Sequence, residues 1–249
     1  MLDMGYCTLE DVRRALREAD LPGDVSQDKR IAVDAVTSQT EPLRKSLKRH
    51  WYAQEGARIL DEASEITIPT SPKTRDDEYD IPTSAAWTVD DGGPMPKTSQ
   101  GSYAKIDLAR RDAEAVSALH VRTEDGTYED WAASADYTAG SWPPSGADYY
   151  LRVNNGGWSR LYLDTTNLLK DGEDDEYVLD SFANSIYLEW SHGHEGIPEN
   201  VRRAVAFRAA ADLTERPSFS IPDNSQVYGA ESKAEDLREQ ADELLKVYT

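Results

Sequence analysis

Residues 8 to 52 carry apolar side chains at the three- and four-residue spacing of amphipathic helices. A first helix is expected to begin at Thr8, a residue type that caps helix starts, and to end before Pro22. A second helix is expected from about residue 26 or 28 to residue 52. Pro42 interrupts or restarts it, because proline lacks the backbone donor that an interior position needs. The apolar faces include Leu9, Val12, Leu16, Ala19, Ile31, Ala35, Leu43, Leu47 and Trp51.

From about residue 60 to residue 192 the pattern changes to short stretches of alternating polar and apolar residues. Asp125-Gly126 and residues 154–157 each separate two such stretches, as β-hairpin turns do. Further strands are expected in SEITIPT (64–70) and NSIYLEWSHG (184–193). The segments 70–82 and 90–102 are polar and rich in proline or glycine, so they are expected as loops.

Helical spacing returns at Pro198, which suits a first helical position because its missing N–H has no partner there. The apolar stripe of this helix is expected at Val201, Val205, Ala209 and Leu213, and that of a final helix at Leu237, Ala241, Leu244, Leu245 and Tyr248. The predicted fold class is therefore α+β. N- and C-terminal helices (1–60 and 196–249) form a helical bundle, and residues 61–195 form an inserted antiparallel β-barrel or sandwich.

Composition places the chain among globular proteins. Its 249 residues are 39% apolar, and no run approaches the roughly 18 apolar residues of a membrane span. The N-terminus lacks the basic-then-apolar order of a signal peptide, so we expect synthesis in the cytoplasm and no membrane partner. A single cysteine, Cys7, excludes an intrachain disulfide and is expected to be a small buried residue.

The net charge of −20 is unevenly distributed. Residues 1–60 carry ten positive and ten negative side chains, residues 61–195 carry ten and 27, and residues 196–249 carry seven and ten. Together with 18 Arg against nine Lys, this pattern favours a halophilic source; a DNA-mimicking or cation-binding surface is the rival explanation. Such acidity argues against a nucleic-acid groove, but it is compatible with duplex DNA sliding through a repulsive pore.

No nucleophile with a base, phosphate loop or zinc-protease motif is found, so no catalytic residue or cofactor is predicted. His192, His194 and Glu195 are the best metal candidate, since alternate residues of a strand share a face. A third ligand is not evident, and a turn from strand into helix is favoured. The acidic run at residues 171–176 lacks EF-hand spacing. The basic group Arg44, Lys45, Lys48 and Arg49 is either a solvated helix face or a docking surface for an acidic partner.

Four segments, taken in order, resemble head-tail connector (adaptor) proteins of tailed phages and related archaeal viruses. They are YCTLEDVRRAL, IAVDAVTSQTEPLRKSLKRHWY, IYLEWSHGHEGIPENVRRAVAFRAAADLTERP and LLKVY. The likeness covers residues 6–52 and 186–248. The chain departs from the family pattern at Pro42, at the histidine of GHEG where an aromatic residue is usual, and in its acidic insertions.

The resemblance implies a structural virion protein, made in the host cytoplasm and located in the neck. Family members form a ring, usually of twelve copies, below the portal and extend the DNA channel toward the tail. Implied partners are the portal ring, neighbouring copies, a downstream neck, stopper or tail protein, and duplex DNA bound without sequence specificity. We expect portal contact from residues 218–249 and from the basic group. The candidate residues are Arg44, Lys45, Lys48, Arg49, Phe219, Ile221, Val227, Tyr228, Leu244 and Tyr248.

Two other functions remain open at this point. A halophilic extracellular β-rich module that binds carbohydrate or calcium would use the six tryptophans and the acidic middle of the chain. A metal-dependent hydrolase would use His192, His194 and Glu195. The mass of the assembled protein and its metal content separate these alternatives from a connector.

Overall fold

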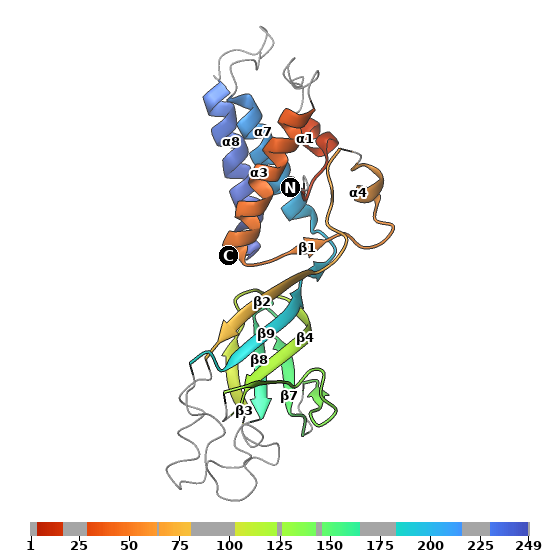
Figure 1. The fold of residues 1–249 in the computed structure, drawn as a ribbon. Coiled ribbons are helices and arrows are strands. Elements are labelled where there is room, and N and C mark those ends of the chain that lie inside the picture. Colours follow the sequence, from red (N-terminus) through yellow and green to blue (C-terminus); the bar gives the residue numbers. More distant parts are fainter. Residues whose placement is uncertain are drawn as a thin grey trace, which may run out of the picture. The chain divides into compact units, whose positions relative to one another are not determined.

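Figure 1 shows a computed structural model of the chain, which describes residues 4–16, 29–63, 65–80, 103–123, 126–142, 146–164, 183–215 and 230–248. The chain divides into two compact units. The helical unit comprises residues 1–71 and 194–249, and the β unit comprises residues 72–193. The chain thus crosses from one unit to the other twice, after Ser71 and after Gly193. By sequence alone these boundaries were expected near residues 60 and 195.

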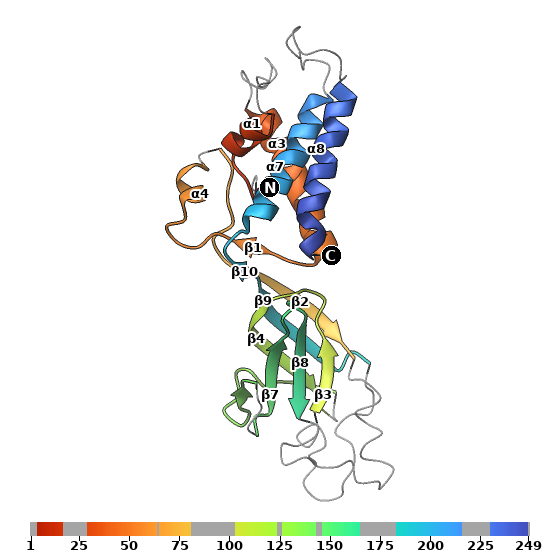
Figure 2. The same cartoon turned by 180° about the vertical axis from the view of Figure 1, so that it is seen from behind.

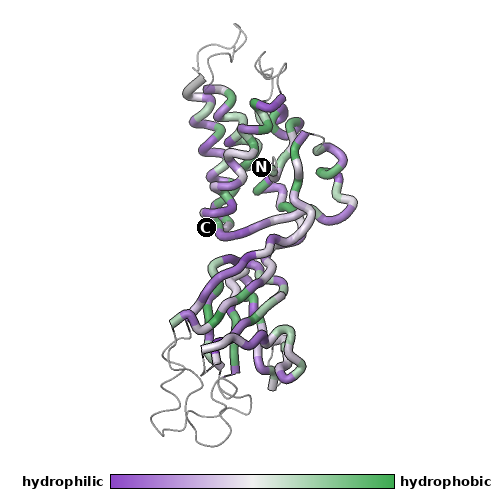
Figure 3. The backbone as a smooth tube through the Cα atoms, viewed as in Figure 1, coloured by the Kyte–Doolittle hydropathy of each residue, from purple (hydrophilic) through white to green (hydrophobic). Residues whose placement is uncertain are grey.

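The helical unit is built around α7 (Glu199–Thr214), against which α1 (Leu9–Leu16), α3 (Arg30–Leu47) and α8 (Ala230–Leu245) pack. A short helix α4 (Arg58–Asp61) lies in the N-terminal half of the unit, and a 3-10 turn η1 (Lys246–Tyr248) follows α8. Figures 1 and 2 show α7 and α8 side by side in both views. Figure 3 shows apolar segments in green alternating with polar ones along these helices.

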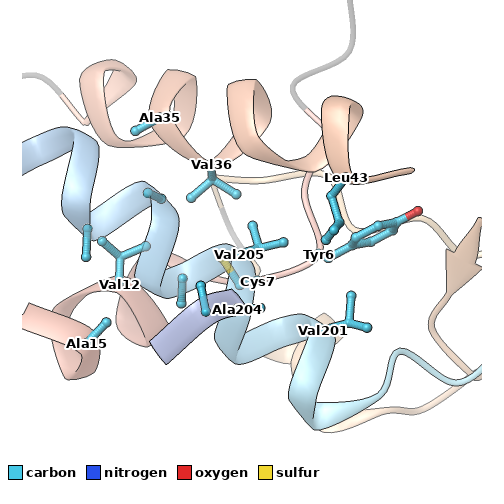
Figure 4. Close-up of a cluster of buried hydrophobic side chains, with 14 of the residues drawn as sticks. Tyr6, Cys7, Val12, Ala15, Ala35, Val36, Leu43, Val201, Ala204 and Val205 are labelled. Carbon is cyan, nitrogen blue, oxygen red and sulfur yellow. The ribbon is translucent and has the colours of Figure 1, made fainter. Parts of the chain in front are cut away.

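The core of the helical unit is filled by small and β-branched side chains of α7. Val201, Val205, Ala209 and Leu213 are fully buried, which confirms the predicted stripe. Ala204, Ala206, Ala210 and Ala211 are buried as well, so α7 is covered on most sides. Figure 4 shows Val201, Ala204 and Val205 meeting residues of α1 and α3. Alanines allow close approach of the helix axes, which explains how one helix can hold three neighbours.

Cys7 lies inside this core with none of its surface exposed, as expected for a small buried residue. Burial raises the pKa of its thiol well above the ordinary value, so the thiolate is scarce at neutral pH. We expect no reaction of the folded protein with a disulfide reagent such as DTNB at pH 8, and one equivalent of reaction after unfolding. Stoichiometric labelling under native conditions within minutes would contradict the structure.

Two helix boundaries differ from the sequence prediction. Helix α3 runs without interruption from Arg30 to Leu47, with Pro42 inside it. Pro42 is exposed, so water can satisfy the carbonyl that its missing N–H leaves without a backbone partner. Pro198 is the residue before the first turn of α7 rather than within it, a shift of one position.

The β unit contains two four-stranded sheets. The first sheet has the order β2 (Lys73–Tyr79), β9 (Ile186–His192), β4 (Ala113–Arg122), β5 (Tyr128–Asp130). The second sheet has the order β3 (Tyr103–Asp107), β8 (Ser159–Asp164), β7 (Tyr149–Val153), β6 (Ala139–Gly140). All neighbouring strands are antiparallel except β6 and β7.

Apolar residues from both sheets form one core between them. Leu188 and Trp190 of β9 belong to the same core cluster as Leu161 and Leu163 of β8, and all four are fully buried. The strands alternate between this core and the outer faces; β9 shows the pattern most clearly, with every second residue from Ile186 to His192 buried. The fold is therefore α+β. Among the described strands no pairing joins the two sheets into a closed barrel, and they pack as a sandwich.

The predicted hairpins are present, but two other predictions in this region are wrong. Strands β4 and β5 pair around Gly126, and β7 and β8 pair around the turn at residues 154–157. Residues 65–70, the described part of the segment expected as a strand at 64–70, form no strand, only an isolated bridge between Met4 and Thr67. Conversely, residues 73–79, expected as a loop, form the edge strand β2. Charged residues are common on edge strands, where they block unwanted pairing.

Candidate functional site

The structure brings the end of α3 together with the end of the chain. The ring of Trp51, four residues after α3, lies 5.6 Å from the ring of Tyr248 in an edge-to-face arrangement. Burial raises the pKa of Tyr248, and the nearby Arg49 acts against this shift. Figures 1 and 2 both place the C-terminus beside this end of α3. The basic group and the C-terminal residues, expected as two separate contacts, therefore form one surface. We call it the C-terminal face.

The four predicted cations differ in accessibility. Arg44 is largely covered and pairs with Glu41 at 2.6 Å, so it acts within the helical unit. The side chain of Lys45 is 66% exposed and its amine lies 3.7 Å from Glu41. Lys48 is exposed and Arg49 is half-buried. Lys45 and Lys48 are therefore the members of the group most accessible to a partner.

The apolar residues predicted at the end of α8 have a largely internal role. Leu244 and Tyr248 are half-buried and pack against the helical core. Between them in sequence, Val247 is 72% exposed, and the adjacent Lys246 is exposed and pairs with Glu243. Lys246 and Val247 lie within the predicted contact range 218–249, but they were not among the individually named candidates. The sequence contains a signal for this site, because Val247 is apolar but does not belong to the apolar stripe of the final helix. Phe219, Ile221, Val227 and Tyr228, also predicted as contacts, lie outside the described residues.

The C-terminal face combines exposed cations with an exposed apolar side chain. It consists of Lys45, Lys48, Arg49, Lys246 and Val247, at the C-terminal ends of α3 and of the α8–η1 segment. Cations at these ends also interact favourably with the negative ends of the helix dipoles, at about 0.3–1 kcal/mol each. That effect accounts for their presence but not for the exposed Val247. The face is chemically suited to a partner with carboxylates around an apolar centre.

Lys48 has a second, purely structural property. It ends α3 in the left-handed region with a φ of 55°, where a side chain is strained and glycine is not. We expect Lys48→Gly to raise the free energy of unfolding of the helical unit by about 1 kcal/mol. Lys48→Ala keeps the strain and should change it little. Denaturant unfolding of the two variants measures the difference, and equal stability would contradict the assigned backbone conformation.

The two histidines at the second crossing have different environments. His192 is buried on the inner face of β9, with its ring centroid 5.2 Å from that of Trp190. His194 belongs to the helical unit and is exposed, with its Nδ1 2.8 Å from the Glu195 carbonyl oxygen. The expectation that alternate residues share a face thus does not hold at Gly193. In the part of the chain that the structure describes, no three His, Cys, Asp or Glu side chains gather as metal ligands.

His50, three residues after the end of α3, bonds to the chain at both crossings. It precedes β1 (Trp51–Tyr52), which pairs in parallel with β10 (His194–Glu195). The His50 Nε2–H donates to the Ser71 carbonyl oxygen at 3.1 Å, and the His50 carbonyl oxygen accepts from the His194 N–H at 2.9 Å. Its Nδ1 lies 3.2 Å from the Tyr6 hydroxyl. One buried residue therefore fixes both ends of the helical unit where the chain leaves and returns.

Comparison with known proteins gives a limited result. No family model matches the sequence, and no curated protein does. One similar chain belongs to a solved structure of the virion of a native gene transfer agent particle, with a TM-score of 0.43 and 10% identity, over 92% of this chain and 88% of that one. Another belongs to the neck of an empty particle of that kind, computed with C6 symmetry, with a TM-score of 0.41 at the same identity and coverage. The similarity is limited to the path of the backbone.

No helix in the described ranges combines the length and the apolar character that a membrane crossing requires.

Proposed function

We propose that the protein is a structural component of a tailed virion, a head-tail connector in which copies form a ring below the portal and continue the DNA channel toward the tail. The observation that carries the proposal is the assembly of the family-like segments. YCTLEDVRRAL and the α3 segment from the N-terminal half, and the α7 segment and LLKVY from the C-terminal half, fold into one unit around α7. The β unit is inserted between these halves.

The distribution of charge supports the same function. Residues 72–193 carry ten positive and 23 negative side chains, a net of −13, whereas the helical unit carries 17 and 24, a net of −7. Burying an uncompensated charge in an interface is costly, so the less charged unit is the better candidate for the portal contact. We assign that contact to the C-terminal face of the helical unit, and the acidic β unit to contacts with neighbouring copies, the next neck protein or solvent.

An alternative extracellular carbohydrate-binding module is less well supported by the tryptophans. Trp51, Trp131 and Trp190 are buried in the cores of the two units. Trp142 and Trp158 are exposed, but an arginine guanidinium lies over each ring, at 3.9 and 4.1 Å from the centroids. Sugar-binding aromatic residues need a free ring face. The acidic run at residues 171–176, the candidate calcium loop, lies outside the described residues.

The test is imaging and mass measurement of the purified full-length chain, alone and mixed with the portal protein of the same virus. We expect a closed ring and a ring–portal complex. The double substitution Lys45→Glu/Lys48→Glu should weaken portal binding by about tenfold or more, since like charges then face an acidic partner.

Arg13→Glu/Arg14→Glu is the matched control. It reverses the same number of charges in the same unit, on side chains that are 54% and 58% exposed on α1. It should leave portal binding unchanged. If both double variants lose portal binding equally, the C-terminal face is not the portal contact. If the wild-type chain never binds portal, the connector function itself is wrong.

A further inference from the structure

The two outer faces of the β unit carry opposite local charge. On the first sheet the outward residues of β2 and β9 include Asp76, Glu78 and Glu189. We call this the acidic face. On the second sheet the outward residues of β3, β7 and β8 include Lys105, Arg152 and Arg160, together with the two carboxylates Asp107 and Asp164. We call this the arginine face, and it is exceptional in a unit whose net charge is −13.

Each face contains a pair of like charges in direct cross-strand register. Asp76 on β2 is opposite Glu189 on β9. Arg152 on β7 is opposite Arg160 on β8. Such pairs destabilise an isolated sheet, because the side chains of opposing residues lie close together. Two unfavourable pairs of opposite sign, one on each side of the same sandwich, suggest that the faces serve a purpose other than folding.

The charges of these four side chains are only partly neutralised by oppositely charged partners within the β unit. Arg160 pairs with Asp107, but in the described part of the chain Arg152 has no carboxylate partner, and its guanidinium lies 3.9 Å from the centre of the Trp142 ring. Asp76 receives a hydrogen bond from the Tyr187 hydroxyl at 3.3 Å and Glu189 one from the Ser117 hydroxyl at 3.2 Å, and among the described residues Asp76 has a charge interaction with Arg75. Burial together with the surrounding carboxylates raises the pKa of Tyr187, as a negative local potential requires.

The arginine face is also preformed. Tyr150 and Tyr162 are directly opposite each other on the same side of the sheet, two residues from Arg152 and Arg160; their rings stack with centroids 4.6 Å apart, and both side chains are buried. Trp142 packs beside Tyr150 and remains 51% exposed. The stacked tyrosine pair, with the exposed Trp142 and Arg152 beside it, has the composition of an interface centre. Tyrosine, tryptophan and arginine contribute most of the binding energy in many protein contacts.

We propose that the arginine face binds the acidic face of a second copy of this chain, with Arg152 and Arg160 set against Asp76 and Glu189. The occupant is identified by charge complementarity, because the same molecule presents the matching surface on its opposite side. Each contact then relieves both unfavourable cross-strand pairs at once. The proposal rests on the ring assembly proposed above and specifies which surfaces of the β unit build it.

The geometry of such a contact is head-to-tail. Two different surfaces meet, so every copy keeps one free acidic face and one free arginine face for the next copy. A heterologous contact of this kind generates a ring when the rotation closes. On the acidic face, Asp76 and Glu189 would meet the same two carboxylates in a two-fold symmetric dimer, so like-charge repulsion disfavours that arrangement.

The experiment compares the full-length chain with Arg152→Glu and with Glu189→Lys by sedimentation velocity at one fixed salt concentration. Each variant alone should show an association constant lowered by at least about tenfold, because like charges meet at every contact. An equal mixture of the two variants should recover assembly. The altered arginine face of one then meets the altered acidic face of the other, and the unaltered faces pair as before.

Thermal unfolding supplies a second readout. Arg152→Glu removes the repulsion from Arg160 and also the guanidinium contact with Trp142, so at a concentration where both proteins are monomeric its β unit should melt at about the wild-type temperature although its assembly is weaker. A substitution that merely damages the fold would lower both. Glu10→Lys, an exposed charge reversal on α1 of the helical unit, is the matched control for Glu189→Lys and should assemble like the wild type.

The outcomes separate this proposal from the proposed function. If the wild type forms rings and both single variants assemble equally well, the face-to-face contact is wrong and the connector function stands. If each variant fails alone and the mixture also fails, head-to-tail pairing of these faces is overturned. If the wild type stays monomeric at all concentrations, both the ring and the contact are lost.

Discussion

Replacing Asp11 with alanine is expected to lower the free energy of unfolding of the helical unit by about 3 kcal/mol. Asp11 accepts hydrogen bonds from the backbone N–H and the hydroxyl of Thr8, both at 2.9 Å, and so caps α1. It also receives two hydrogen bonds from Arg202 of α7, at 2.7 and 2.8 Å. Only 12% of the Asp11 side chain and 23% of the Arg202 side chain are exposed, so water cannot replace these contacts easily.

Chemical denaturation followed by circular dichroism measures this effect. Glu10→Ala is the matched control, since Glu10 is the adjacent acid of α1, 46% exposed, with arginine partners at 3.4 and 3.8 Å. Exposed pairs contribute little, and the control should lose less than about 1 kcal/mol. The double variant Asp11→Ala/Arg202→Met should lose less than the sum of its two single substitutions, because both remove one interaction. Additive losses would show that Asp11 and Arg202 act independently.

Replacing Trp51 with alanine should cost the helical unit about 3–5 kcal/mol, the usual range for deleting a buried tryptophan. Trp51 is 1% exposed, and its ring meets those of Tyr6 and Tyr248 edge-to-face at 5.7 and 5.6 Å. The substitution removes the edge-to-face contact between Trp51 of β1 and Tyr248 of η1, which holds η1 in place. It should therefore weaken portal binding through the C-terminal face as well as stability.

Trp158→Ala provides the comparison, because Trp158 is 41% exposed and its loss should cost the fold about 1 kcal/mol or less. Thermal and denaturant unfolding give the two stabilities, and the binding assay with portal gives the second effect. Retention of full portal binding by a folded Trp51→Ala variant would show that η1 does not depend on this ring for its position.

The helices were predictable because apolar residues at three- and four-residue spacing indicate both a helix and the face of that helix that is buried. In α7 the stripe from Val201 to Leu213 marks the face that any helix of this sequence would bury. The alanines on its other sides gave no such signal, since alanine is tolerated on buried and exposed faces alike. That α7 is central to the unit therefore became visible only when its three neighbours were placed around it.

The β unit was predicted less completely, and β2 shows why. Its sequence, KTRDDEY, has one apolar residue in seven, and the pairing that makes it a strand comes from β9, more than a hundred residues away. Edge strands owe their structure to such a partner and not to their own composition. The segment 64–70 is the reverse case: it alternates well, but it belongs to the helical unit and not to the unit that holds the four-stranded sheets, and its described residues form only an isolated bridge with Met4.

For the candidate site, residue types were easier to predict than their combination. The sequence identified Lys45 and Lys48 as surface cations and Tyr248 as part of an amphipathic helix, but their convergence depends on how α3 and α8 pack on α7. The arginine face shows the same limit. Arg152 and Arg160 are unremarkable in sequence, and only the β7–β8 register sets them directly opposite each other.

The hydrogen bonds of His50 have a consequence for how such a protein can be rebuilt. Because Ser71 and His194 both bond to this one residue, the points where residues 72–193 enter and leave the helical unit are neighbours in space. A short glycine-serine link from Ser71 to His194 would close the chain without moving α1, α3, α7 or α8. We therefore expect that a β unit from another chain can replace residues 72–193 when it is joined at these two peptide bonds.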